Sequence, residues 1–445
     1  MSTERIDRYR DSVGARTSIV CLVLSAATSD ASPIAGSELA ASDLGWPATT
    51  AAAVVRQHLE VFETADHGRR IGSISSGTRV AWKKIIATRD ACKAWVALEP
   101  RGWVCARDLA PSAQPPSGNP STPVTPVYKD KVAAIKPAGA DAFDDLAQIK
   151  ANVPARRLDE RTPVTIRGGA AWKNVDNVNY VRTDQGWISA HDMWWYNATD
   201  FSGVELAPNA ALDVAWAVAH RPGARIPVRD QPDAKAKPIR TLAPRERVSA
   251  FETKGNFIRI GSDEWVERGE LRRTEKRTRP DGVAPTERWM DVDLDQQTIV
   301  LYDGDAPVYA TLVATGKDKW FTPVGIYRIK SKVANTRMRD PGGMEEEWNV
   351  EDVPWVMGFR RNFALHGAYW HESFGRRLSH GCVNLSPTDA KRVYEFVTPD
   401  APAGWTRVDV HDGAGTPMRI RTSWMPNPKW YDYEGKALST TTAKR

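Results

Sequence analysis

The sequence predicts a mainly β protein built from several small domains. Its 445 residues exceed the usual size of one domain, and this length suggests roughly two to four domains. Apolar and polar residues alternate over short stretches bounded by glycine turns, which is the period of β-strands. A tryptophan that follows glycine or glutamate and precedes valine or isoleucine recurs three times before the C-terminal third of the chain. We therefore expect a row of small β modules followed by a larger β domain.

The N-terminus has the pattern of an export signal. Four arginines between positions 5 and 16 precede an apolar run over 18–27 that ends in small residues. This predicts a signal peptide over 1–27, with a mobile N-terminus as the alternative. Residues 28–50 have the alanine- and serine-rich composition of a linker. No stretch approaches the length of a membrane helix, so we expect an exported protein of the periplasm or cell envelope without a transmembrane segment.

Charge and composition narrow the class of partner only slightly. A net charge of +6 and a pI near 9.0 suit an anionic envelope polymer, although most proteins this basic are simply soluble. Eighteen tryptophans can offer platforms for sugars or peptides, but small β domains also use tryptophan in their cores, and we favour the core role. We expect no nucleic-acid partner.

Three segments share a weak repeat. The copies are Gly102–Leu109, Gly186–Met193 and Glu264–Leu271. An aromatic residue precedes each tryptophan by seven or eight positions, namely Trp95, Tyr180 and Phe257. Each copy closes a unit large enough for its own core, so we expect separate modules and not a solenoid. The predicted modules are 51–110, 154–200 and 214–275, the third being the weakest match.

The closing pattern, Gly-Trp-[Val/Ile]-x-x-x-[Asp/Glu]-[Leu/Met], resembles that of bacterial SH3-like domains. The resemblance implies two or three small β-barrels that bind wall peptides or polymer. Such binding would hold the rest of the chain near an insoluble substrate. The alternative is that the modules are spacers or packing partners, because strand alternation alone identifies no binding residue.

Cys92 and Cys105 occur only in the first module. The matching positions hold Asn177 and Lys254 for Cys92, and Ser189 and Glu267 for Cys105. Two cysteines that are present together in one copy and absent together from the others are predicted to bond to each other, with two free thiols as the alternative. A disulfide requires an oxidising compartment, in agreement with export. Cys382 would then be the only free thiol of the mature protein.

Connecting segments are marked by proline and by charge. Residues 111–127 predict a semi-rigid linker that lets the first module move independently, and 141–151 predict a short helix before the second module. The charged, glycine-rich insert over 335–350 is a candidate lid, although we favour an idle surface loop. The basic extension over 413–445 contains Trp430 and is expected to be strapped onto the preceding domain or partly disordered.

A larger β domain is predicted over 288–412. Met290, Val292 and Leu294 alternate with three aspartates, which predicts a half-buried strand, and Asp303-Gly304 is a turn signal, so a meander or sandwich follows.

A short helix is predicted near the end of this domain. Ser386 is its expected cap, with Pro387 at the first helical position, and Pro399 ends it. The apolar face comprises Ala390, Val393, Tyr394 and Val397. This face is expected to pack behind the cysteine loop that precedes the helix.

The chemistry-bearing stretch is Phe363–Leu385. It contains His366 and, sixteen residues later, Cys382 within Ser-His-Gly-Cys-Val-Asn. Thiolate is the attacking species in cysteine catalysis, and an adjacent imidazole lowers the thiol pKa by accepting the proton. The amides of Gly381 and Cys382 are candidate donors to an oxyanion. No Asp or Asn stands out as the group that orients the imidazole, and a carbonyl near Gly367 is the candidate substitute.

Two other roles of Cys382 stay open at this point. The first is an inert, buried cysteine. The second is a zinc ligand together with His366, His371 and His380, but the spacing matches no common zinc pattern. The clustering of histidine, glycine, cysteine and asparagine favours catalysis.

The order His366-Gly367, about a dozen residues, then Ser379-His380-Gly381-Cys382-Val383-Asn384 resembles the active-site signature of the L,D-transpeptidase (YkuD-like) catalytic domain. The similarity extends from Trp289 to about residue 412 and includes Thr315-Gly316 and the turn Thr322-Pro323-Val324-Gly325. The resemblance implies a β-sandwich. It also implies that Cys382 is the nucleophile, His366 the base and the Gly367 carbonyl the group that orients His366. Loop support would come from Ser379, His380, Gly381 and Asn384.

The implied reaction is acyl transfer on peptidoglycan stem peptides. Cys382 would attack the bond between the diamino acid at position three and D-alanine at position four, and an amine would resolve the thioester into a 3→3 cross-link. Water as acceptor would make the protein a carboxypeptidase or endopeptidase, and a silent site would make it a wall-binding scaffold. The resemblance implies no cofactor and no metal, and it implies acylation of Cys382 by carbapenems.

Overall fold

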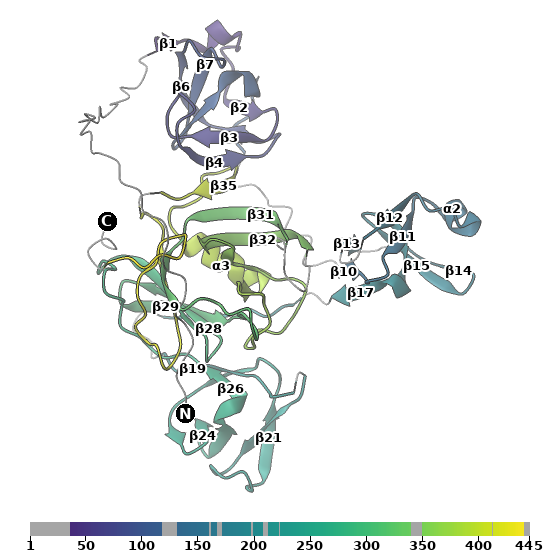
Figure 1. Cartoon of the computed structure of the whole chain (residues 1–445), viewed down its shortest axis with the longest axis vertical. Helices are drawn as coiled ribbons and strands as arrows, with labels where there is room; N and C mark the ends of the chain where they lie inside the picture. The colour runs from purple at the N-terminus through teal and green to yellow at the C-terminus, as the bar shows by residue number, and fades with distance from the viewer. Residues whose placement is uncertain are drawn as a thin grey trace, which may run out of the picture. The chain divides into compact units, whose positions relative to one another are not determined.

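The computed structural model describes residues 36–117, 131–159, 162–166, 171–196, 199–207, 212–221, 223–339, 349–411 and 413–439. Strands dominate this part of the chain, and its only α-helices are α2 and α3 (Figure 1). None of its helices has the length and apolarity needed to cross a bilayer. The predicted signal peptide lies outside the described residues, as do parts of the proline-rich linker and of the charged insert.

Three modules precede the C-terminal domain and share one topology. The first contains β1 (Glu38–Leu39), η1 (Ala41–Leu44), β2 (Ala52–Val55), β3 (Leu59–Phe62), β4 (Arg70–Ile74), β5 (Arg79–Val80), β6 (Trp82–Ala87), β7 (Ala94–Leu98), β8 (Trp103–Cys105), η2 (Ala106–Asp108) and β9 (Leu109–Ser112). The second contains β10 (Lys131–Ile135), β11 (Ala140–Phe143), α2 (Leu146–Ala151), β12 (Arg156–Leu158), β13 (Pro163–Ile166), β14 (Trp172–Val175), β15 (Val178–Thr183), β16 (Gly186–Ser189), η3 (Ala190–Asp192) and β17 (Met193–Tyr196). The third contains β19 (Val214–Ala217), β20 (Ile226–Arg229), β21 (Pro238–Leu242), β22 (Arg247–Ser249), β23 (Thr253–Lys254), β24 (Phe257–Gly261), β25 (Glu264–Glu267), η4 (Arg268–Glu270) and β26 (Leu271–Arg273).

The strand register shows that the modules are true structural repeats. Trp95 pairs with Cys105, Tyr180 with Ser189 and Phe257 with Glu267, which are equivalent positions in the sequence alignment. Each module also carries a three-stranded sheet and a 3-10 helix directly after its tryptophan strand. Within the described residues, however, the sheets of each module stay separate and form no closed barrel. The predicted SH3-like barrels are therefore not confirmed.

The second module differs locally from its prediction. Strand β10 begins at Lys131 and pairs with β13 and β17, so pairing starts well before residue 154. The expected helix over 141–151 is shorter, because β11 occupies the first residues and α2 begins after Asp145. The Asp145 carboxylate accepts a hydrogen bond from the Gln148 amide and thereby caps the helix.

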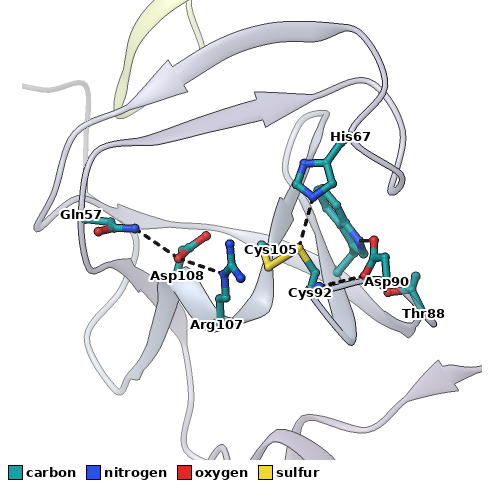
Figure 2. The surroundings of a disulfide bond; sticks show 9 residues. Gln57, His67, Thr88, Asp90, Cys92, Cys105, Arg107 and Asp108 are labelled. Atoms are coloured by element: carbon teal, nitrogen blue, oxygen red, sulfur yellow. Dashed lines mark hydrogen bonds and ion pairs between the residues drawn. A yellow bond between two sulfur atoms is a disulfide. The ribbon is translucent and has the colours of Figure 1, made fainter.

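A disulfide joins Cys92 to Cys105 in the first module, with their Cα atoms 5.4 Å apart (Figure 2). Cys92 lies in the turn before β7, and Cys105 ends the neighbouring strand β8. Asp90 holds this turn, since its carboxylate accepts hydrogen bonds from the Cys92 amide at 2.9 Å and the Thr88 hydroxyl at 2.7 Å. The pairing is the one expected from the joint absence of cysteine in the other two modules.

The first module shares a sheet with the C-terminal domain. Strand β4 pairs with β35 (Trp405–Asp409), and Trp405 is fully buried in the core of the first module. Independent movement of this module, which the linker predicts, would require these contacts to break.

The C-terminal domain has two facing sheets. Its strands are β27 (Arg288–Asp293), β28 (Thr298–Asp303), β29 (Ala306–Leu312), β30 (Gly325–Arg328), β31 (Ser331–Arg339), β32 (Asn349–Arg360), β33 (Phe363–Gly367), β34 (Val383–Leu385), β35 and β36 (Pro417–Arg421). One sheet has the order β18-β29-β28-β27-β36-β30, where β18 (Val204–Glu205) comes from the segment after the second module. The other contains β35-β31-β32-β33-β34. Helix α3 (Pro387–Phe396) packs against β32, β33 and β34 and lies beside β31 and β32 in Figure 1.

Helix α3 forms as its sequence predicts. The Ser386 hydroxyl accepts a hydrogen bond from the Asp389 amide, and Pro387 occupies the first turn, where its missing N–H costs nothing. Ala390, Val393 and Tyr394 are buried against the sheet. The helix thus lies directly behind the strand pair β33–β34, which flanks the cysteine.

Strand β27 is buried on both faces, so the expectation of a half-buried strand is wrong. Asp291 is only 2 % exposed, because β36 runs parallel beside β27 and supplies two arginines. Arg419 Nε lies 2.5 Å and Arg421 Nε 2.9 Å from the Asp291 carboxylate. Apolar residues and aspartates alternate along β27, so one face of the strand is apolar and the other is ionic. Both faces are shielded from water.

Described parts of the charged insert and of the C-terminal extension belong to the C-terminal domain, and the extension is strapped onto it, as one of the two expectations had it. Residues 335–339 belong to β31, where Asn335 pairs with Pro354 of β32. In the extension, Trp430 is buried and its indole N–H donates to the Asp281 carbonyl at 2.8 Å.

Lys332 of β31 predicts an unusual pH dependence of stability. Its ammonium group is buried, donates to the carbonyls of Val397 at 2.6 Å and Pro399 at 3.1 Å, and lies 4.5 Å from the centre of the Tyr394 ring. Burial lowers its pKa from 10.5 to about 8. Between these two values the unfolded chain binds more protons than the folded one, so the free energy of unfolding should rise with pH by up to ~1.4 kcal/mol per unit.

Urea denaturation at pH values from about 7.5 to 9.5 measures this slope, below the range in which tyrosines ionise. Lys332→Met keeps the length of the side chain and removes the titrating group, so it should lose the rise. Parallel pH profiles for the wild type and Lys332→Met would contradict the lowered pKa.

Candidate active site

Strand β33 carries His366, and the adjacent strand β34 begins directly after Cys382, whose sulfur lies 4.0 Å from the Asn362 carbonyl oxygen. The two strands run parallel, with His366 opposite Asn384 and Leu365 opposite Val383. Cys382 directly precedes β34 and lies two residues before Asn384, so its side chain belongs on the face shared by His366 and Asn384. Cys382 is the only free cysteine in the described part of the chain, and its side chain is partly exposed. This face is the candidate active site.

The ring of His366 is fixed by a backbone carbonyl. His366 Nδ1 lies 3.2 Å from the Gly367 oxygen, and because a carbonyl can only accept, Nδ1 must carry the proton. In the neutral ring, Nε2 then has a free lone pair. The Trp370 ring stacks on the imidazole at 5.7 Å between centroids. The structure therefore places the carbonyl of Gly367 where the missing orienting group is needed, and it leaves Nε2 able to accept a thiol proton.

Hydrogen bonds hold the loop before Cys382 on both sides. The Ser379 hydroxyl donates to the Cys382 carbonyl at 2.5 Å and accepts from the Gly381 amide at 3.1 Å. Thr322 Oγ1 donates to the Gly381 carbonyl and accepts from the Gly316 amide, both at 2.9 Å. Gly381 adopts φ +112°, which is strained for any residue with a Cβ. The loop conformation thus depends on glycine and on two hydroxyls.

These contacts correct the predicted oxyanion hole. The Gly381 amide already donates to Ser379 and is not available to a substrate oxygen. The Cys382 amide takes no part in these loop hydrogen bonds and stays a candidate donor. The ring of His380 makes an edge contact with Trp320 at 4.5 Å between centroids.

Burial sets the charge states of the pair. It raises the pKa of the Cys382 thiol to about 11 and lowers the pKa of His366 to about 4. The expectation that the histidine depresses the thiol pKa in the resting protein is wrong in direction, because desolvation of the thiolate outweighs hydrogen bonding. At neutral pH the resting site holds a thiol and a neutral imidazole. The imidazole is therefore in the state that a general base requires.

A second histidine completes the site. His371 Nε2 lies 3.0 Å from the Asn384 amide nitrogen, and His371 Nδ1 accepts from the Ser373 amide at 3.1 Å. The backbone of Asn384 is bound in both directions to Ala314. The sequence had offered His371 only as a zinc ligand.

The structure does not assemble a zinc site from the three histidines and the free cysteine. Among the described residues, His366, His371, His380 and Cys382 do not form a group with ligand atoms close enough to share an ion. The cluster that has such spacing is His67, Asp90 and Cys92 beside the disulfide (Figure 2), where the sulfur of Cys92 is already bonded to Cys105.

Sequence reasoning missed two contributors to the site. Thr322 was visible only as part of a turn, although its hydroxyl reaches Gly381 across 59 positions of the chain. The role of His371 depends on Asn384, thirteen positions away, and no local pattern signals that contact.

Replacing His366 should change the pH dependence of thiol alkylation. The rate for Cys382 with iodoacetamide should be nearly constant from about pH 5 to 9 in the wild type and fall near pH 4, where His366 becomes protonated. His366→Gln should lower the rate at pH 7 by about 10²- to 10⁴-fold, and the rate should then climb with pH toward 11.

Intact mass measures this alkylation, and His191→Gln, with a side chain 87 % exposed, serves as the control. A wild-type rate that changes steeply between about pH 6 and 8 would contradict a neutral resting pair.

Comparison with known families finds one match, in the C-terminal domain. Residues 287–420 match the model of the L,D-transpeptidase catalytic domain (YkuD), and this range contains the strand pair β33–β34 and the cysteine loop. This part of the chain is therefore similar to YkuD-like L,D-transpeptidase catalytic domains. No curated protein matches the chain.

Several solved structures are similar to part of this chain. An L,D-transpeptidase of Enterococcus faecium is 20 % identical, with a TM-score of 0.24, and the match covers 30 % of this chain and 50 % of that one. One from Stackebrandtia nassauensis is 26 % identical, with a TM-score of 0.23 and coverages of 33 % and 58 %. The E. faecium catalytic domain acylated by ertapenem is 20 % identical, with a TM-score of 0.25 and coverages of 30 % and 97 %. This chain thus spans about half the length of the first of these proteins.

Proposed function

We propose that the protein is a peptidoglycan L,D-transpeptidase whose nucleophile is Cys382 and whose base is His366. The observation that carries the proposal is the Nδ1–H to Gly367 carbonyl contact, which leaves Nε2 as a proton acceptor on the face that carries the free thiol. A structural histidine in a core has no need of a fixed tautomer beside a free cysteine. The match of residues 287–420 to the catalytic-domain model supports the same assignment.

The chemistry follows from these positions. His366 Nε2 takes the thiol proton as the sulfur attacks the carbonyl between the diamino acid and D-alanine of a tetrapeptide stem. The tetrahedral intermediate collapses, the C–N bond breaks, and the proton on His366 passes to the departing D-alanine. An amine of a second stem then attacks the thioester, and the products are a 3→3 cross-link and the free thiol.

Incubation with disaccharide-tetrapeptide, followed by mass spectrometry, tests the proposal. Dimers that have lost one D-alanine are the expected products, and Cys382→Ala provides the blank. Tripeptide monomers alone would make the protein a hydrolase that uses water as acceptor. An unchanged substrate with both proteins would leave a wall-binding scaffold as the function.

The same site should react with carbapenems. A strained β-lactam carbonyl presents an acyl group without needing the stem peptide, so ertapenem should add its full mass to Cys382. Digestion and peptide mapping locate the adduct.

We assign the three N-terminal modules to capture of the cell wall by SH3-like domains in an exported protein. Their shared register shows one repeated unit, and repeated weak binding to a polymer raises the local concentration of stems at the catalytic domain. The Cys92–Cys105 disulfide agrees with an oxidising compartment. Sedimentation with purified peptidoglycan sacculi of the full chain carrying Cys382→Ala measures this binding without turnover.

A further inference from the structure

The tautomer of His371 is fixed by its neighbours. The Ser373 amide donates to His371 Nδ1 at 3.1 Å, and a backbone amide cannot accept, so Nδ1 carries a lone pair. The ring is buried, and burial lowers its pKa to about 3. A neutral ring with a free Nδ1 lone pair has its only proton on Nε2. His371 therefore presents an N–H donor toward Asn384.

This donor determines how the Asn384 amide must be oriented. The Asn384 nitrogen lies 3.0 Å from His371 Nε2, while Asn384 Oδ1 is buried without a hydrogen-bond partner. In this orientation the N–H groups of Asn384 and His371 would face each other, and Asn384 Oδ1 would accept no hydrogen bond. A half-turn about the Cβ–Cγ bond exchanges oxygen and nitrogen, which have nearly the same size and shape. Oδ1 then accepts from His371, and the group left without a partner is the amide NH₂.

Asn384 lies on the strand face that carries the candidate active site. Asn384 is opposite His366 in the parallel strand pair and two residues after Cys382, so the three side chains share one face. Both backbone groups of Asn384 are bound to Ala314, with N···O distances of 2.9 Å. The side chain is 4 % exposed, and a buried N–H without an acceptor is costly to maintain. A bound acceptor would remove that cost.

We propose that the Asn384 side-chain NH₂, held in this orientation by His371, is the second donor of the oxyanion hole at Cys382. The first donor is the Cys382 amide. The inference rests on the proposed function. A second donor is needed because the Gly381 amide already donates to the Ser379 hydroxyl.

The Asn384 amide donates its hydrogen bond when the substrate oxygen becomes negative. As the sulfur–carbon bond forms, the π pair of the substrate carbonyl moves onto its oxygen, and the thiol proton goes to His366 Nε2. The negative oxygen is then met by two N–H donors. When the carbonyl re-forms, the C–N bond breaks and the leaving nitrogen takes the proton from His366. Asn384 donates in the tetrahedral state and exchanges no proton, whereas His371 is a positioning residue that never touches the substrate.

Comparing two reactions of Cys382 tests this role. Acylation by ertapenem passes through an oxyanion, but alkylation by iodoacetamide does not, and both need the thiol proton removed. Asn384→Ala should slow acylation by about 10²- to 10³-fold while leaving the alkylation rate and its pH profile within about threefold of the wild type. Asn384→Asp keeps an acceptor for His371 but loses the N–H donor, so it should also slow acylation. It replaces Asn384→Ala in the test if that variant does not fold.

Controls separate the possible failures. Asn174→Ala, at an exposed asparagine of the second module that pairs with Asn179, should change neither rate. Equal losses in acylation and alkylation for both Asn384 variants would mean a structural role and overturn the inference, as would unchanged acylation. A wild type that is alkylated but never acylated would overturn the proposed function, and the inference with it.

His371 can be tested separately. His371→Gln retains an N–H for Asn384 Oδ1 and should preserve more of the acylation rate than His371→Phe, with alkylation similar in both. Ring nitrogen NMR of the folded protein should show the Nε2–H tautomer, and an Nδ1–H tautomer would remove the premise.

Discussion

Cys382→Ala should abolish acyl transfer while the protein stays folded. The substitution removes only the sulfur, and the proposed nucleophile has no substitute because no other free cysteine occurs in the described part of the chain. Removing a covalent nucleophile typically costs on the order of 10⁴-fold or more. The side chain is only partly buried, so we expect the free energy of unfolding to change by about 1 kcal/mol at most. Product analysis by mass spectrometry and urea denaturation measure the two effects.

Cys382→Ser makes the comparison sharper. It restores a hydroxyl of nearly the same size, whose pKa lies far above that of a thiol, and His366 should activate it poorly. We expect very slow formation of a stable ester adduct with ertapenem and negligible turnover of stems. Wild-type rates in either variant would mean that the reaction takes place elsewhere.

Asp291→Ala should strongly destabilise the protein. Asp291 is buried between Arg419 and Arg421, and Arg421 also contacts Asp293 at 2.8 Å. Removing the shared carboxylate leaves two buried guanidinium groups with only one acidic partner. Such a loss costs about 3–5 kcal/mol. Urea denaturation of the purified variant measures it as a lower midpoint with an unchanged slope.

A surface ion pair provides the matched control. Asp305 lies 3.2 Å from Arg279, but its side chain is 71 % exposed. Asp305→Ala should therefore change the free energy of unfolding by less than about 1 kcal/mol. Similar effects of the two substitutions would show that the Asp291 cluster is hydrated or replaceable.

The features that the sequence predicted well are local ones. The cap of α3 depends on Ser386 and Asp389, three residues apart, and the apolar spacing around Val393 is set by the helix period. The repeat was visible for a similar reason, because Trp95 and Phe257 occupy equivalent places relative to a nearby strand. Local chemistry determines these features, so a single sequence contains them.

Features that depend on distant partners were predicted poorly. Asp291 looked solvent-facing because its neutralising partners arrive from residues 419 and 421 along a parallel strand. The burial of Trp405 in the first module, more than 300 positions from its partner Ile74, has no sequence signal either. Alternation shows that a strand has two faces, but it does not show what covers each one.

The candidate site shows the same division. The motif located His366, Gly367 and Cys382, whose relation follows from two neighbouring strands. It did not show that the Gly381 amide is occupied, since that depends on the rotamer of Ser379. It also gave the wrong direction for the thiol pKa, because desolvation is a property of the packed site and not of the residue order.

The raised pKa of Cys382 has a consequence for the chemical stability of this residue. Because burial raises the pKa of the thiol above its usual value, the sulfur is mostly protonated at pH 7. Peroxides and disulfides attack the thiolate, so this sulfur is a poor target for oxidants. The same chain carries an oxidised pair at Cys92 and Cys105. An environment that closes that disulfide can therefore leave the nucleophile reduced until a carbonyl substrate arrives beside it.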